Sequence, residues 1–65
     1  MIVLDYRDKR PLNEQVAEKL MNLIVQGVLH PGERLPSVRN LAVDLSVNPN
    51  TIQRAYAALE EKGYI

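Results

Sequence analysis

The sequence predicts a mainly α-helical domain in which three helices form a helix-turn-helix arrangement. Apolar residues recur at helical spacing in three separate segments, residues 12–26, 37–44 and 49–62. Each segment is flanked by residues that commonly start or end helices. Only Leu45-Ser46-Val47 separates the second helix from the cap of the third. The chain has 65 residues, which is enough for one small hydrophobic core but leaves little room for a buried active-site cleft.

The first predicted helix follows an N-terminal arm, residues 1–11, which we expect to be extended. Within residues 12–26, one apolar stripe is formed by Val16, Leu20, Leu23 and Ile24. Gly27 then suits the left-handed conformation that ends many helices. The residues His30-Pro31-Gly32 place proline and glycine where a type II turn needs them, so we expect the chain to reverse there.

The second predicted helix is short and begins after Ser37. Because Pro36 disfavours a helical conformation at the residue before it, Leu35 should be extended and Ser37 free to cap the helix. The apolar positions that follow are Val38, Leu41, Ala42 and Leu45. So short a helix is not stable alone in water, so we expect packing against its neighbours to hold it.

The third predicted helix begins at the Asn48-Pro49 pair. Proline is tolerated at the first helical position, where its missing N–H would have no partner, and asparagine is among the best residues at the cap before it. The apolar stripe that follows consists of Ile52, Ala55, Tyr56 and Leu59. Gly63 is placed to end the helix, and we expect Val47 to pack into the core.

The opposite face of this third helix carries polar side chains near its start. The residues on that face are Asn50, Gln53, Arg54 and Ala57, and the acids Glu60 and Glu61 follow farther along. In the major groove of DNA, asparagine and glutamine pair with adenine and arginine pairs with guanine. We therefore predict that the helix 49–62 enters the major groove. A plain three-helix bundle without a ligand fits the pattern equally well, so the choice between them stays open at this point.

Three arginines lie between residues 34 and 54, although the formal net charge of the sequence is zero. Arg39 lies near the start of the second helix, where a cation beside free N–H groups would hold a phosphate or reach a guanine. Arg34 is a weaker candidate of the same kind. A surface salt bridge is the alternative role for Arg39.

Other classes of function find little support in the sequence. There is no cysteine and only one histidine, His30, so a Cys/His metal site is excluded, and we expect no cofactor. No acid–base pair, activated nucleophile or glycine-rich phosphate loop indicates an enzyme. No apolar stretch reaches the length of a membrane span, and the charged N-terminus does not resemble a signal peptide, so we expect a soluble, cytoplasmic protein.

The sequence resembles the N-terminal domain of the GntR family of bacterial transcription regulators in two stretches, PLNEQV and GVLHPGERLPSVRNLAVDLSVNPNTIQRAYAALEEKGYI, within residues 11–65. The combination of NPNT with RAY resembles the YtrA-type subfamily, whose effector domains are short. The resemblance implies a winged helix-turn-helix at residues 12–65 that binds DNA as a homodimer, usually as a repressor that a small-molecule metabolite relieves. It also implies that the wing is truncated at Ile65 and that the effector domain is absent from this sequence.

The resemblance further implies which residues contact DNA. Arg39 matches the family arginine that reaches a base or phosphate, Thr51 matches the threonine at the start of the recognition helix, and Ser37 matches the capping serine. Many family members have Ser/Thr-Arg where this chain has Asn48-Pro49, so our hypothesis is that Asn50 and Arg54 take over part of that arginine's role. The full predicted contact set is Arg34, Ser37, Arg39, Asn48, Asn50, Thr51, Gln53 and Arg54. The expected partner is double-stranded DNA with an inverted-repeat operator, and the alternative is a winged-helix module that uses the same surface for protein–protein contact.

Overall fold

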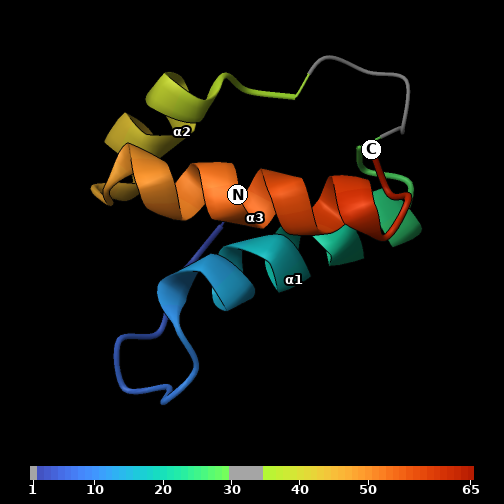
Figure 1. Ribbon diagram of the computed structural model, residues 1–65. Coiled ribbons are helices and arrows are strands. Elements are labelled where there is room, and N and C mark those ends of the chain that lie inside the picture. The colour runs from blue at the N-terminus through green and yellow to red at the C-terminus, as the bar shows by residue number, and fades with distance from the viewer. Residues whose placement is uncertain (1, 30–34) are drawn as a thin grey trace.

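A computed structural model of the chain describes residues 2–29 and 35–65 (Figure 1). These residues form three helices and no strand: α1 (Leu12–Val25), α2 (Val38–Leu45) and α3 (Pro49–Glu61). The predicted mainly α fold class is therefore confirmed, and each helix ends within one residue of the expected position. The predicted turn at His30-Pro31-Gly32 and the candidate residue Arg34 lie outside the described residues.

The core forms around α3, which lies between the other two helices (Figure 1). In the described part of the chain, the backbones of α1 and α2 each approach α3 and not one another. The buried apolar side chains are Ile2, Val16, Leu20, Leu41, Ala42, Ile52, Ala55 and Leu59. With the exception of Ile2, all of them belong to the predicted stripes. Val47, in the turn between α2 and α3, packs partly buried against this core, as expected.

All three helices end in the same hydrogen-bonded motif, in which one residue after the helix has a positive φ. At the ends of α1 and α3 this residue is Gly27 (φ 81°) and Gly63 (φ 82°), as the sequence predicts. At the end of α2 it is Ser46 (φ 56°), which sequence analysis did not identify. The motif there is closed by the Val47 N–H, which donates to the Ala42 carbonyl at 3.0 Å. The turn of the helix-turn-helix is therefore closed by hydrogen bonds, and its left-handed residue is Ser46 and not a glycine.

The N-terminal segment differs from the extended arm expected at residues 1–11. Residues 6–10 form a turn and bends, because the carboxylates of Asp5 and Asp8 accept hydrogen bonds from the N–H groups of Arg7 and Arg10, both at 2.9 Å. Ile2 is only 9% exposed and belongs to the core. The segment therefore folds back onto the helices.

Gln15 holds this segment in place. Its side chain is 2% exposed, and its Oε1 accepts a hydrogen bond from the Asp5 N–H at 2.9 Å. Its Nε2 donates to the carbonyl oxygens of Asp5 at 3.0 Å and of Arg10 at 3.2 Å. Arg10 adds ion pairs to Asp8 and to Glu18 of α1. The start of the chain is thus part of the folded domain.

Candidate nucleic-acid interface

One face of α3 is free of contacts with the core. Ile52, Ala55 and Leu59 are buried on the inner side of this helix. At about 100° per residue, the opposite side carries the residues that sequence analysis placed there, and the structure shows each of them exposed: Asn50, Gln53, Arg54 and Ala57. Thr51 is half-buried. The structure therefore brings the predicted base-reading residues Asn50, Gln53 and Arg54 onto one accessible surface, which we call the α3 face.

The start of α3 is fixed by the predicted cap. The Asn48 side-chain oxygen accepts a hydrogen bond from the Asn50 N–H at 2.8 Å, and Pro49 occupies the first helical position. The Thr51 N–H donates to the Asn48 carbonyl at 2.9 Å. The cap uses one of the two lone pairs of the Asn48 side-chain oxygen, and its amide NH₂ group is free to donate to a ligand.

The start of α2 provides the remaining predicted contacts. The Ser37 hydroxyl oxygen accepts a hydrogen bond from the Asn40 N–H at 3.0 Å, which confirms the predicted cap. Arg39 is the second residue of the helix and is exposed. Within residues 2–29 and 35–65, Arg39 has no ion-pair partner, so the structure provides no support for the alternative salt bridge.

Charge on the described surface is divided along α3. Like Arg39, Arg54 makes no ion pair with any residue that the structure describes. The exposed acids Glu60 and Glu61 lie at the far end of α3. At a rise of 1.5 Å per residue, Glu60 is about 15 Å along the axis from Asn50. A negatively charged ligand at the start of the helix would therefore meet Arg54, which has no ion-pair partner among the described residues, and would be separated from Glu60 and Glu61.

Tyr56 makes a contact that sequence analysis missed. Its hydroxyl donates a 2.6 Å hydrogen bond to the carbonyl oxygen of Pro36, directly before the Ser37 cap of α2. Burial raises the pKa of this hydroxyl, so it remains protonated and able to donate at neutral pH. The periodicity of α3 places Tyr56 at the edge of the core, but no sequence signal identifies its acceptor, because the two residues are joined only by the tertiary fold.

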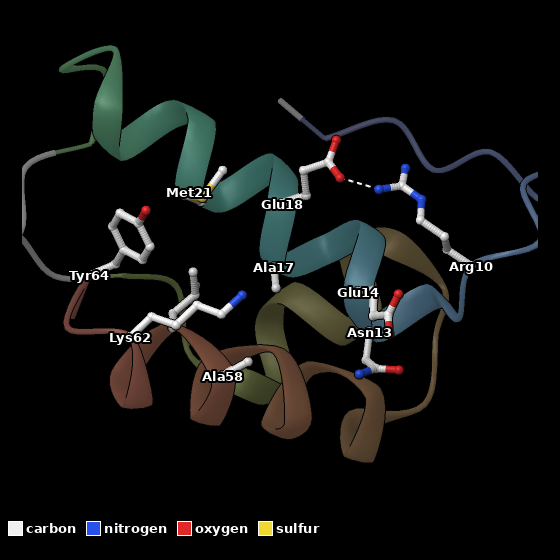
Figure 2. A pocket seen from close by; sticks show the side chains of 10 residues that line it. Arg10, Asn13, Glu14, Ala17, Glu18, Met21, Ala58, Lys62 and Tyr64 are labelled. Atoms are coloured by element: carbon white, nitrogen blue, oxygen red, sulfur yellow. Dashed lines mark hydrogen bonds and ion pairs between the residues drawn. The ribbon is translucent and has the colours of Figure 1, made fainter.

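A groove of about 450 Å³ lies elsewhere on the molecule, between α1 and the second half of α3 (Figure 2). Ala17 and Met21 of α1 line it opposite Ala58 of α3, while Lys62 and Tyr64 lie at one end and Arg10 at the other. None of the predicted DNA-contacting residues lines this groove. The groove and the α3 face are therefore separate surfaces.

The described residues contain neither a metal-binding cluster nor a helix that could span a membrane. No three His, Cys, Asp or Glu side chains in residues 2–29 and 35–65 are grouped so that they could hold a metal ion. None of the helices formed by these residues combines the length and apolar character that a membrane crossing requires.

Comparison with known proteins identifies the family. The family model described as "Bacterial regulatory proteins, gntR family" matches residues 12–65, which is most of the chain. The chain belongs to the GntR family. The three helices therefore form the helix-turn-helix domain of this family of bacterial regulatory proteins, and the predicted family is confirmed.

Individual relatives agree with this assignment. The chain is 43% identical over 65 residues to the HTH-type transcriptional repressor YtrA of Bacillus subtilis, covering all of this chain and 50% of that protein. It is 40% identical over 60 residues to the regulator YhcF of the same organism, covering 92% of this chain and 50% of YhcF. A solved structure of YtrA from Sulfolobus acidocaldarius, a GntR-family transcription factor, has a TM-score of 0.92 and 42% identity, covering 95% of this chain and 66% of that one. The chain thus spans about half the length of the two Bacillus relatives, which are themselves transcription regulators.

Proposed function

We propose that this GntR-family domain binds double-stranded DNA sequence-specifically, with α3 in the major groove. The observation that carries the proposal is the α3 face, where Asn50, Gln53 and Arg54 are all exposed. The opposite side of the helix is fixed in the core by buried apolar residues. The polar side chains are therefore held in a set orientation and remain free to meet base edges.

The dimensions and chemistry of α3 suit this role. The major groove of B-DNA is about 12 Å wide and admits one α-helix. Asn50 and Gln53 each offer an amide that can pair bidentately with adenine, and Arg54 offers a guanidinium that can pair with guanine. Ala57 leaves room for close approach one turn later. The acids at the far end of α3 would lie outside the groove or at its edge.

Phosphate contacts would then come from the helix starts. Arg39 is the main candidate, because it is exposed beside the N-terminus of α2, where free N–H groups also favour an anion. Thr51, Ser37 and Asn48 would contribute donor groups of their side chains. The oxygens of Ser37 and Asn48 already accept capping hydrogen bonds. Arg34 belongs to the proposed set as well, although it lies outside the described residues.

We further propose that the protein acts as a repressor, as a homodimer on an inverted-repeat operator, and that a small metabolite relieves repression. Support comes from a relative named as a transcriptional repressor, of which this chain covers half the length, leaving room in that protein for a further domain. A bacterial repressor of this kind works in the cytoplasm, where the chromosome lies.

Salt dependence tests the proposal against use of the same surface for protein–protein contact. A fluorescently labelled duplex would carry an inverted repeat from the DNA flanking the protein's own coding region, and a random duplex of equal length would serve as control. We expect tight binding to the repeat. A plot of the logarithm of the association constant against the logarithm of salt concentration should be a falling line, with a slope of about −0.9 for each phosphate neutralised. Equal affinity for both duplexes, or binding to neither, would refute sequence-specific DNA binding.

A further inference from the structure

The hydrogen bond from Tyr56 to Pro36 joins the two helices of the helix-turn-helix at a specific point. Among side-chain hydrogen bonds in the described part of the chain, it is the one that links α3 to the region of α2. Its acceptor lies one residue before Ser37, which caps α2, and three residues before Arg39. The bond therefore acts at the end of α2 that carries the proposed phosphate contacts.

The two ends of α2 are attached differently. The far end continues into the turn, where the Val47 N–H bonds to the Ala42 carbonyl and Asn48 caps α3. The near end follows the non-helical residues 35–37 and has no such turn. In addition, the backbone of α2 approaches α3 and not α1 within the described structure. Close to this near end, the partly buried Val38 packs against the core, and the Tyr56 hydroxyl bonds to the Pro36 carbonyl.

We propose that Tyr56 is a positioning residue for DNA binding, which sets the place of Arg39 relative to the α3 face. This inference rests on the proposed function. Tyr56 is partly buried on the side of α3 that faces the segment before α2, so it does not itself reach DNA. The residues of the α3 face are fixed by the buried side of their own helix and do not depend on this bond.

This division predicts a specific defect for the variant Tyr56→Phe. Loss of the hydroxyl frees the start of α2, so the Arg39 contact weakens while base reading by α3 persists. Removing one hydrogen bond should lower affinity by about 2- to 10-fold. If Arg39 contacts a phosphate, the loss should be similar on operator and random duplexes, and the salt slope should become shallower by up to about 1. A purely structural loss of stability would leave the salt slope of the folded protein unchanged.

A double-mutant cycle in the full-length protein provides the test. Affinity and salt slope would be measured for the wild type, Y56F, R39A and the double variant, at a temperature where circular dichroism shows each to be folded. Tyr6→Phe is the matched control, because Tyr6 is 69% exposed and its hydroxyl makes no hydrogen bond with the described residues. We expect Y56F to reduce DNA affinity in the wild-type background and to have no further effect in the R39A background. The control Y6F should bind DNA as the wild type does.

Three results would overturn the positioning role. The first is an additive effect of Y56F and R39A, the second is a Y56F protein that binds DNA with unchanged affinity and slope, and the third is a Y56F protein that does not fold. Arg54→Ala in the same assay tests the proposed function separately. If R54A loses operator binding while Y56F behaves as the wild type, only the positioning role is wrong, and if no variant affects binding, the proposed function is wrong as well.

Discussion

Replacing Gln15 with glutamate tests how the N-terminal segment is held. The side-chain amide donates two hydrogen bonds, to the carbonyls of Asp5 and Arg10, and accepts one from the Asp5 N–H. Gln15→Glu keeps the acceptor, removes both donors and sets a carboxylate oxygen against two carbonyl oxygens at a site that is 2% exposed. Each lost hydrogen bond costs about 0.5–1.5 kcal/mol, and the buried charge adds to this, so we expect a loss of about 2–4 kcal/mol.

That loss is large for a domain of this size. At about 0.05–0.15 kcal/mol per residue, the free energy of unfolding of a 65-residue domain is on the order of 3–10 kcal/mol. Urea denaturation followed by circular dichroism would measure the difference. Gln53→Glu is the matched control, because it makes the same chemical change at an exposed position and should alter stability by less than about 0.5 kcal/mol.

The same variant should show a characteristic pH dependence. Burial and the facing carbonyls raise the pKa of the introduced carboxyl in the folded state above its value in the unfolded chain. The folded state then binds this proton more tightly, so the stability deficit relative to the wild type is smallest at low pH and grows as pH rises through the folded pKa. A deficit that equals that of Gln53→Glu at neutral pH would show that Gln15 does not hold the N-terminal segment.

Three further changes probe the turns of the domain. Ser46→Gly should raise the free energy of unfolding by about 0.5–1 kcal/mol, because a non-glycine residue at φ 56° is strained; a loss of stability in urea denaturation would contradict this. Pro49→Ala should change stability by less than about 1 kcal/mol, since Asn48 keeps its cap, and a larger loss would mean that proline itself fixes the turn. Hydrogen bonds from Arg10 lower the pKa of the Asp8 carboxyl, so NMR titration should find it below the ordinary value, and Arg10→Gln should return it toward that value; no change would refute the pairing.

The sequence predicted the helices well because each of them carries its own local signals. Burial of the stripes follows from the helical period, and the caps at Ser37 and Asn48 follow from residue type and the neighbouring prolines. Gly27 and Gly63 marked two helix ends for the same reason. Ser46 was missed because serine rarely adopts a left-handed conformation and nothing in the local sequence signals it.

Contacts between distant segments carried no such signal. Gln15 pairs with Asp5 across ten residues, and Tyr56 pairs with Pro36 across twenty. No periodicity and no neighbouring residue in the sequence predicts either hydrogen bond. For the same reason the N-terminal segment was expected to be an extended arm, although Ile2 is part of the core. The candidate α3 face was predicted because exposure on one helix follows from its own periodicity, while its contacts with DNA remain a prediction.

The affinity of Arg54→Ala for operator and random duplexes tests sequence-specific reading by the α3 face most directly. Lys62→Ala is the matched control, since Lys62 is a cation at the end of the same helix that lines the separate groove. We expect Arg54→Ala to cost about 1–3 kcal/mol of binding free energy on the operator and little on random DNA, because a base contact is lost. Lys62→Ala should change neither affinity. An equal loss on both duplexes, or no loss on the operator, would contradict base reading by Arg54 and with it the proposed role of this face.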